Sequence, residues 1–130
     1  MEIPVKMAGG RAVEATVGGH TVRADQPVAS GGGGTAPSSS DLFLASIAMC
    51  CAYYILDFCL ERKIPTEGIG ILMTTHKNES TKLLDLIELE IALSPKFPEK
   101  YDKAIVRAAE LCWVKKNIQN PPRFETYTVR

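Results

Sequence analysis

The four cysteines, at positions 50, 51, 59 and 112, are the side chains in this sequence with the greatest capacity for chemistry. An ionised cysteine is a strong nucleophile, and an oxidised cysteine needs a second thiol nearby to form a disulfide. On a helix, residues nine positions apart point to opposite faces, so Cys50 and Cys59 cannot serve the same partner. Cys50 and Cys112 each lie on an apolar helical segment, which brings both towards the core and makes them the more promising pair.

Other interpretations of these residues are weaker. A buried cysteine often acts as a small apolar side chain, and this interpretation is retained for Cys59 and less firmly for Cys51, which is also a candidate supporting residue of the site. The sequence has no Cys-x-x-Cys spacing, and His20 and His76 lie in unrelated segments, so no metal site is expected. No Gly-x-Ser-x-Gly motif indicates a hydrolase, and the glycine-rich loop lacks the Gly-Lys-Ser/Thr ending of a phosphate-binding loop.

Length and composition indicate one soluble globular domain spanning residues 1–130, with 45% hydrophobic residues. The formal net charge is zero, so we do not expect a nucleic-acid partner. No secretory signal is evident and the cysteine pattern is a poor disulfide framework, which favours a cytoplasmic protein. The apolar run from Leu42 to Leu56 would extend about 22 Å as a helix. That is too short to cross a membrane of about 30 Å, so the run predicts a buried central helix and no membrane association.

The remaining pattern predicts a mixed α+β fold. Glycine pairs and β-favouring residues predict an N-terminal hairpin, and the Gly/Ser-rich segment that follows is either a flexible connector or a loop giving access to an active site. One of Ser38, Ser39 and Ser40 is expected to cap the central helix, which should run to about Lys63 before Pro65. The expected elements in chain order are strands at 12–17 and 21–25, the central helix, strands at 68–75 and 83–93, a second helix from Pro98 to Cys112 that continues or kinks to Ile118, and a closing strand at 124–129.

Two segments resemble signatures of the OsmC/Ohr family. The first is Pro37-Ser-Ser-Ser-Asp-Leu-Phe-Leu-Ala-Ser-Ile-Ala-Met-Cys50, which is similar to the family's Pro/Ser-rich loop and the helix that carries its reactive cysteine. The second is Ala108-Ala-Glu-Leu-Cys-Trp-Val-Lys115, which is similar to the alanine-rich helix before the family's second cysteine. Together with the glycine-rich loop after a short hairpin, the resemblance extends over nearly the whole chain.

This resemblance implies an OsmC-like α+β fold, built as an intertwined homodimer with active sites at the subunit interface. It implies a peroxidase, or peroxiredoxin, that reduces organic hydroperoxides or hydrogen peroxide without a cofactor. Cys50 would attack the peroxide and become a sulfenic acid, and Cys112 would close a disulfide. An external thiol or dithiol would then reopen that disulfide.

Cys50 also requires a nearby positive charge, because burial raises the pKa of a thiol and the helix dipole acts mainly within the first turn. The family uses an arginine from the N-terminal β region, for which Arg11 is favoured over Arg23. The family's supporting glutamate is replaced by Ser40, so Asp41 either substitutes for it or serves only the helix start.

The second motif departs from the family pattern as well. Trp113 replaces the usual proline and is expected in the core, and Lys115 replaces the usual serine. On a continuous helix, Lys115 and Lys116 would share a face with Cys112 and act on a thiol or an anion, or would simply be solvated.

These departures leave two alternatives to a peroxidase. One is a non-catalytic OsmC-fold dimer that binds an anion or another small molecule. The other is a thiol-disulfide carrier or redox sensor in which Cys50 and Cys112 oxidise reversibly but react slowly with hydroperoxides.

Overall fold

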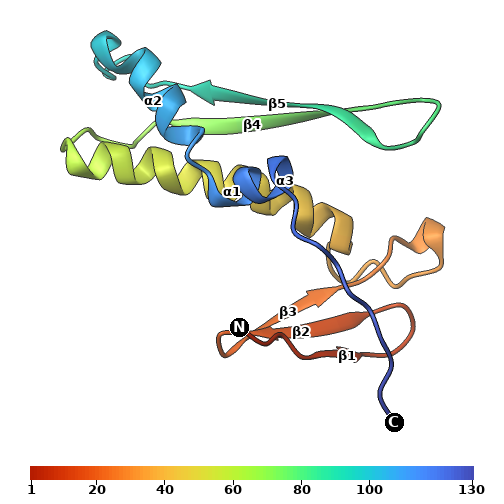
Figure 1. Cartoon of the computed structure of the whole chain (residues 1–130). Coiled ribbons are helices and arrows are strands. Elements are labelled where there is room, and N and C mark those ends of the chain that lie inside the picture. The colour runs from red at the N-terminus through yellow and green to blue at the C-terminus, as the bar shows by residue number, and fades with distance from the viewer. The chain divides into compact units, whose positions relative to one another are not determined.

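The computed structural model describes residues 1–130, which form two compact units, 1–45 and 46–130. The first unit contains strands β1 (Val5–Met7), β2 (Val13–Val17) and β3 (His20–Ala24) and the short 3-10 helix η1 (Val28–Ser30). Helix α1 (Ser39–Glu61) begins in the first unit and lies mostly in the second. The second unit continues with β4 (Gly70–Lys77), β5 (Leu84–Ala92), η2 (Glu99–Tyr101), α2 (Asp102–Ala109) and α3 (Trp113–Gln119) (Figure 1).

The first unit is built on an antiparallel sheet in the order β1-β2-β3. The expected hairpin is confirmed as β2 and β3, which pair Val17 with His20 across the Gly18-Gly19 turn. Both turn glycines have positive φ, a backbone conformation that residues with a Cβ rarely adopt. Strand β1 lies within residues 1–28, where the glycine pairs indicate short strands, and it pairs with β2 after a second turn, at Gly9-Gly10.

The glycine-rich segment after β3 wraps around a buried carboxylate. Asp25 is only 3% exposed, and its oxygens accept hydrogen bonds from the backbone N–H groups of Gln26, Gly33 and Thr35 and from the Thr35 hydroxyl, at 2.7–3.4 Å. A Cβ on Gly32 would lie 1.9 Å from the Gln26 carbonyl oxygen, so only glycine fits there. Hydrogen bonds to Asp25 therefore fix the conformation of this segment, which a flexible connector would not have.

Asp25 gives the first unit a pH-dependent stability. The Thr35 hydroxyl and the surrounding N–H groups lower the pKa of the Asp25 carboxyl from 3.8 to about 2. Because the folded-state pKa is depressed, this contribution to stability is complete above the unfolded-state value near 4 and is lost as the pH falls towards 2. We expect Asp25→Asn to unfold more readily than the wild type in urea at pH 7, with a difference that shrinks between pH 4 and 2. Asp57→Asn, at an exposed site on α1, is the control, and a difference that persists at pH 2 would contradict this role.

Helix α1 begins with a reciprocal cap between Ser38 and Asp41. The Ser38 hydroxyl accepts the Asp41 N–H at 3.1 Å, while the Asp41 carboxylate accepts the Ser38 hydroxyl and N–H at 2.7 and 3.1 Å. This matches the expectation that a serine in this stretch caps the helix. The helix ends at Glu61, slightly before the predicted Lys63, which instead adopts a positive φ of 56°.

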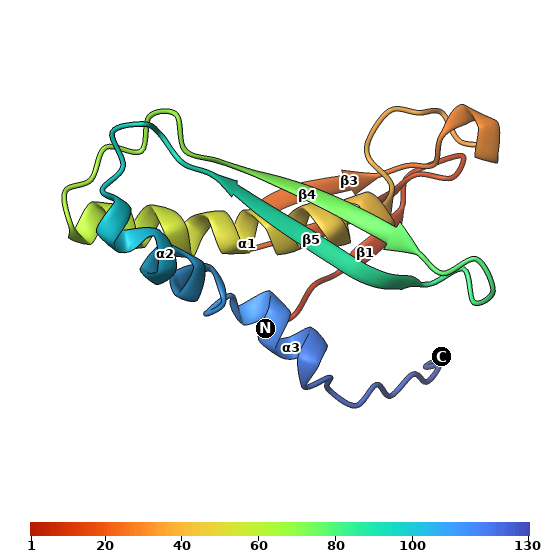
Figure 2. The same cartoon turned by 90° about the horizontal axis from the view of Figure 1, so that it is seen from above.

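Strands β4 and β5 form the second sheet, an antiparallel hairpin that lies along α1 (Figure 2). The strands expected at 68–75 and 83–93 are confirmed with bounds shifted by one or two residues. Their alternation is also observed, since Ile71, Met73, Ile87, Leu89 and Ile91 are partly buried on one face. Leu83, expected on that face, is instead exposed in the turn.

The predicted second helix is interrupted rather than continuous. Helix α2 ends at Ala109, and α3 begins at Trp113 after a short turn. Leu111, expected in the apolar stripe of the helix, lies in this turn and is 51% exposed. The chain therefore changes direction just before Cys112.

The closing strand predicted at 124–129 is absent, so this prediction is wrong. Residues 121–130 carry no regular secondary structure and are exposed. Alternating β-favouring residues describe a local preference, but a strand also needs a neighbouring edge for its N–H and C=O groups, and no strand of this chain pairs with this segment.

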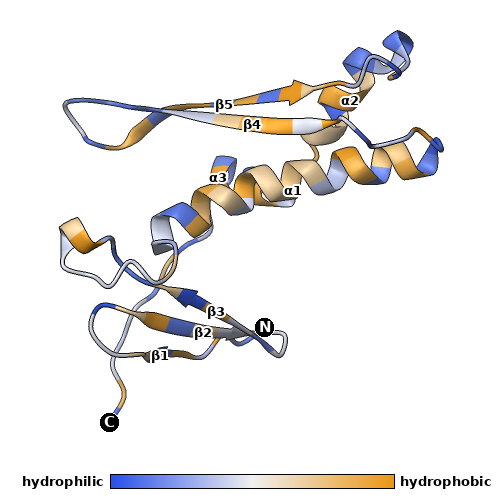
Figure 3. Cartoon of the chain, turned by 180° about the vertical axis from the view of Figure 1, so that it is seen from behind, coloured by the Kyte–Doolittle hydropathy of each residue, from blue (hydrophilic) through white to orange (hydrophobic).

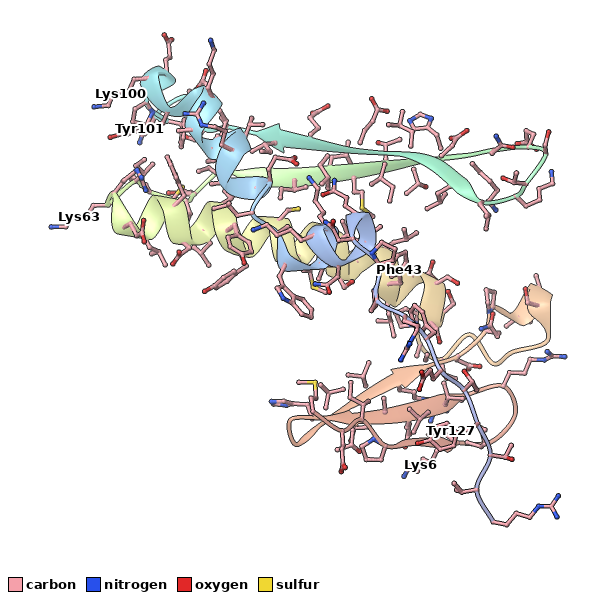
Figure 4. All side chains as sticks on the ribbon, in the orientation of Figure 1. Lys6, Phe43, Lys63, Lys100, Tyr101 and Tyr127 are labelled. Carbon is pink, nitrogen blue, oxygen red and sulfur yellow. The ribbon has the colours of Figure 1, made fainter.

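The core of the second unit forms where α1 packs against α2 and the turn that follows it. Residues Cys51, Ile55 and Phe58 of α1 belong to the same buried cluster as Ile105 and Cys112. At the C-terminal end of α1, Tyr101 packs edge to face on Phe58, with ring centroids 5.7 Å apart; Figure 4 labels Tyr101 there. This packing brings the region around Cys112 to the middle of α1.

Helix α1 is buried along one face only. Its buried residues repeat at three- and four-residue spacing, whereas a second apolar stripe, made by Met49, Tyr53, Leu56 and Leu60, is 43–64% exposed. Figure 3 shows that apolar colour runs along much of the helix. By length and composition alone α1 could cross a membrane. One face of α1 packs in the core of the second unit, as expected of a central helix, whereas its other apolar face is not buried as the sequence predicts.

Candidate active site

Three of the four cysteines gather in the second unit. Cys50 and Cys51 are neighbours on α1; Cys51 and Cys112 belong to one buried cluster, and Cys50 packs against it. Cys51 and Cys112 are fully buried, whereas Cys50 is partly exposed. All four cysteines are free thiols. The pair expected from the sequence is therefore brought together, and Cys51 joins it as a third member of this thiol cluster.

The break between α2 and α3 gives Cys112 its place in the cluster. Cys112 is the N-cap of α3, where its Sγ accepts the backbone N–H of Lys115 at 3.4 Å. The same sulfur lies 4.0 Å from the carbonyl oxygen of Ile47, to which its thiol can donate. The first N–H groups of a helix have no partner within the helix, so a sulfur at this position satisfies one of them.

The first residues of α3 also contact Cys50. The backbone N–H groups of Trp113 and Val114 act as donors to the Cys50 sulfur and favour its ionised form. A proline, which the OsmC/Ohr pattern has at position 113, would have no N–H to offer. The side chain of Trp113 is 67% exposed, so the expectation that it lies in the core is wrong.

The three thiols differ in how readily they ionise. Burial opposes ionisation of Cys112, but the Lys115 N–H and the Cys50 and Cys51 thiols stabilise its negative charge, and together they lower the pKa of Cys112. Burial and the contact with Cys112 raise the pKa of Cys50, despite the two N–H groups of α3. Burial raises the pKa of Cys51 furthest, to about 12. Within this unit, Cys112 is the thiol that ionises most readily.

The two lysines after Cys112 act differently from each other. Because Cys112 caps α3 rather than lying within it, Lys115 reaches the Cys112 sulfur through its backbone and not through its ammonium group. The Lys115 side chain, 17% exposed, instead pairs with Glu110 at 2.5 Å. Lys116 is exposed. The Lys115 charge lowers the pKa of Cys51 against the larger effect of burial, so one lysine acts on a thiol and the other is solvated, although Cys112 does not lie on a continuous helix with them.

A cavity of about 480 Å³ lies between α1, the β4–β5 hairpin and α3. Ile47 and Lys115 line it, and both also contact Cys112, so the cavity adjoins the thiol cluster. Apolar and polar groups contribute nearly equally to its surface, and its lining is formed by Ile47, Leu84, Asp85, Leu86, Ile87, Leu89, Glu110, Lys115, Ile118 and Gln119.

The two candidate arginines both belong to the first unit. Arg23 pairs with Glu14 at 2.9 Å and lies near the Thr35 hydroxyl, so its charge is engaged within its own sheet. Arg11 follows the Gly9-Gly10 turn, and a Cβ on Gly31 would lie 3.0 Å from its Nε. None of the ion pairs in the structure involves Arg11.

The carboxylate of Asp41 is bound to Ser38, which is the helix-start role that the sequence offered as one of two interpretations. Sequence reasoning did not place Cys51 with Cys112, although its position next to Cys50, one helical step of about 100° away, was a usable signal.

Comparison with known proteins gives the following similarities. The family model described as OsmC-like protein matches residues 31–127. No curated protein sequence matches the chain. A solved structure of a putative osmotic stress induced and detoxification response protein from Psychrobacter arcticus is 22% identical, with a TM-score of 0.75 over 88% of this chain and 85% of that one. The organic hydroperoxide resistance protein OhrB of Bacillus subtilis is 23% identical, with a TM-score of 0.54 over 92% and 93% of the two chains. A protein from Legionella pneumophila, described as an organic hydroperoxide resistance protein OsmC, is 22% identical, with a TM-score of 0.54 over 92% and 90%.

Proposed function

Because the chain belongs to the OsmC-like family, we propose that it is a thiol-dependent hydroperoxide reductase. The observation that carries this proposal is the packing of Cys50 against the buried cluster that contains Cys112, close to a cavity whose lining residues Ile47 and Lys115 contact Cys112. Solved structures with a similar fold include proteins described as organic hydroperoxide resistance proteins. A pair of thiols with a substrate-sized cavity next to it is the arrangement that a two-cysteine peroxidase needs.

In the proposed cycle the Cys50 thiolate attacks one peroxide oxygen. The O–O bond breaks, Cys50 becomes a sulfenic acid, and the leaving alkoxide takes a proton to give an alcohol. The Cys112 thiolate then attacks the Cys50 sulfur, forming the S–S bond and releasing hydroxide, which is protonated to water. An external thiol or dithiol reduces the disulfide and returns both cysteines to thiols. No cofactor takes part in these steps.

Cys50 must be ionised for the first step, yet its surroundings within the second unit raise its pKa. The proposal therefore requires a cation from outside this unit, and we assign that role to Arg11. Arg11 is better suited than Arg23 because the Arg23 charge is already paired with Glu14, whereas Arg11 has no ion-pair partner. Asp41 is bound at the helix start and is not assigned a role in activation.

The shape and lining of the cavity favour organic hydroperoxides over hydrogen peroxide. Apolar side chains such as Leu86, Ile87 and Ile118 can contact a hydrocarbon group, and about 480 Å³ is far more space than hydrogen peroxide occupies. Ile47 and Lys115 line the cavity and also contact Cys112, which supports binding of such a substrate with its peroxide end towards the cluster.

The exposed stripe of α1 supports the homodimer. Met49, Tyr53, Leu56 and Leu60 form a continuous apolar surface, and three of them line a groove with residues of the segment leading into β4. A single soluble chain rarely leaves such a surface uncovered. A second copy of this chain can cover both stripes by symmetry.

A reducing cytoplasm, which keeps free thiols reduced, is the compartment that fits the proposed cycle.

One preparation of the reduced wild-type protein tests both parts of the proposal. We expect it to consume cumene hydroperoxide over many turnovers with a dithiol reductant, faster than it consumes hydrogen peroxide. Sedimentation should give a mass twice the 14.2 kDa of the chain. Absence of peroxide consumption above the rate of the reductant alone would rule out the enzyme, and a species of single-chain mass would rule out the dimer.

The raised pKa of Cys50 also favours a second candidate, a protein that keeps the fold without peroxide chemistry. Such a protein would bind an anion or another small molecule, or would carry disulfides and sense redox state. Titration of the thiols separates the candidates, since a Cys50 that remains protonated above pH 8.5 cannot act as a fast nucleophile at neutral pH. Reversible formation of a Cys50–Cys112 disulfide without peroxide turnover would identify the redox-sensing form.

A further inference from the structure

The Arg11 side chain packs against the glycine-rich segment of the first unit. A Cβ built on Gly31 would lie 3.0 Å from the Arg11 Nε and 3.4 Å from its Cζ and Nη2 atoms. The guanidinium group therefore occupies the space that a side chain at position 31 would fill. Because none of the ion pairs includes Arg11, packing rather than charge pairing restricts this side chain.

Hydrogen bonds fix the position of Gly31 in this segment. Gly31 follows η1 with a φ of 82°, and its N–H donates to the Val28 carbonyl oxygen at 3.0 Å. The N–H of Gly32 donates to the Pro27 carbonyl oxygen at 3.1 Å. The buried Asp25 carboxylate binds the residues that follow. The surface on which Arg11 lies is therefore formed by a well-defined loop.

The backbone around Arg11 is fixed as well. The Ala12 N–H donates to the Gly9 carbonyl oxygen at 3.0 Å, and the Ala12 carbonyl oxygen accepts the Ala8 N–H at 2.9 Å. Ala12 itself is buried. An arginine side chain loses much rotamer freedom when its charge must stay in one place, and a surface that restricts it in advance reduces this cost. The contact with Gly31 provides such a restriction.

We propose that Gly31 is a positioning residue, whose missing side chain leaves room for the Arg11 guanidinium and so directs this charge for the ionisation of Cys50. The effect on Cys50 rests on the proposed function, whereas the packing of Arg11 on Gly31 does not. A Cβ at position 31 would meet the flexible end of Arg11 and not another part of the backbone. A substitution there should therefore displace the charge and preserve the fold.

Gly31→Ala tests this role, with Gly34→Ala as its matched control. Both glycines have positive φ, 82° and 61°, so alanine introduces backbone strain at either position. A Cβ on Gly34 would lie 3.4 Å from a methyl group of Val28, and Arg11 is not among its neighbours. Gly31→Asn is the second variant if Gly31→Ala does not fold, because asparagine tolerates positive φ better than alanine does.

The first test measures the motion of Arg11 by nuclear magnetic resonance of its Nε–H group in a Cys50→Ser background, where no thiolate at position 50 can hold the charge. The signal is assigned by its loss in Arg11→Lys. Arg23, whose Nε donates to the Thr35 hydroxyl, provides the reference for a restricted arginine, and the exposed C-terminal Arg130 provides the reference for a mobile one.

We expect the heteronuclear NOE of Arg11 to be close to that of Arg23 when Gly31 is present. It should fall to the value of Arg130 in Gly31→Ala and stay unchanged in Gly34→Ala. An Arg11 that is already as mobile as Arg130 with Gly31 in place, or an equal change in the two alanine variants, would overturn the proposal.

The second test measures the effect on Cys50 in otherwise wild-type protein. Displacing a cation raises the pKa of a nearby thiol, so Gly31→Ala should slow consumption of cumene hydroperoxide about three- to tenfold at pH 7 and shift the half-maximal rate to higher pH. Gly34→Ala should show neither effect. In an Arg11→Ala background, Gly31→Ala should cause no further loss, because the charge that it displaces is already absent. Equal losses with and without Arg11 would refute the directing role.

The two tests fail separately from the proposed function. If the wild type consumes no peroxide, the rate at which iodoacetamide alkylates Cys50 replaces peroxide consumption, with the same variants and the same expected differences. An inactive wild type in which Gly31→Ala alone mobilises Arg11 and slows alkylation would refute the enzyme and support the role of Gly31. Normal turnover with no change at Arg11 would refute that role and leave the enzyme intact.

Discussion

Replacing Cys50 by serine should reduce peroxide consumption at least about a thousandfold, to the rate of the reductant alone. A serine hydroxyl has nearly the size of the thiol but does not ionise at neutral pH, so the attack on the peroxide is lost while the contacts with α3 remain. Stopped-flow measurement of peroxide loss with a dithiol reductant gives the rate. The result would show that the partly exposed thiol of the cluster carries the chemistry.

The controls for Cys50→Ser use the other cysteines of α1. Cys59→Ser changes a buried thiol that is remote from the cluster, and it should retain peroxide consumption unless the fold is lost. Circular dichroism on both variants establishes that they are folded. Full activity in folded Cys50→Ser would refute the proposed mechanism, and it would direct attention to Cys112, which ionises more readily within the second unit.

Replacing Cys112 by serine should instead limit the protein to one turnover. Cys50 still attacks the peroxide, but its sulfenic acid then has no resolving thiolate within contact, because Cys51 stays protonated. We expect one equivalent of peroxide to be consumed and the sulfenic acid to accumulate, trapped by a 1,3-diketone and located on Cys50 by peptide mass analysis.

Continued turnover in Cys112→Ser with a dithiol reductant would contradict the resolving role, because it would mean that the reductant attacks the sulfenic acid directly. A disulfide between Cys50 and Cys51 in this variant would contradict the expectation that Cys51 stays protonated. Loss of all turnover in Cys50→Ser and a single turnover in Cys112→Ser would therefore distinguish the attacking thiol from the resolving thiol.

Much of the fold followed from local patterns in the chain. Gly18-Gly19 between β-favouring residues predicted the first hairpin, and the alternation around Ile87, Leu89 and Ile91 predicted the second. The serines before Asp41 predicted the start of α1 to within a residue. These features depend on backbone conformation and short-range capping, which neighbouring residues largely determine.

Predictions that depended on distant partners were less accurate. The segment at 124–129 has the composition of a strand but no strand beside it, and Trp113 is apolar but lies on the surface. The sequence left open whether the second helix is continuous or kinked between α2 and α3. It therefore could not predict where Lys115 lies relative to Cys112. In each case the outcome depends on which surfaces the rest of the chain brings into contact.

The sequence by itself determined the mixed α+β class, the family resemblance, and the choice of Cys50 and Cys112 as the thiols of interest. Tertiary structure alone decided that Cys51 joins them, that Cys112 caps α3, and that the pKa of Cys112 is lowered while that of Cys50 is raised. The physical reason is that a thiol ionises according to its burial and its hydrogen-bond donors. For Cys50 the N–H donors are those of Trp113 and Val114, more than sixty residues away in the chain, so their effect exists only once α1 and α3 have packed together.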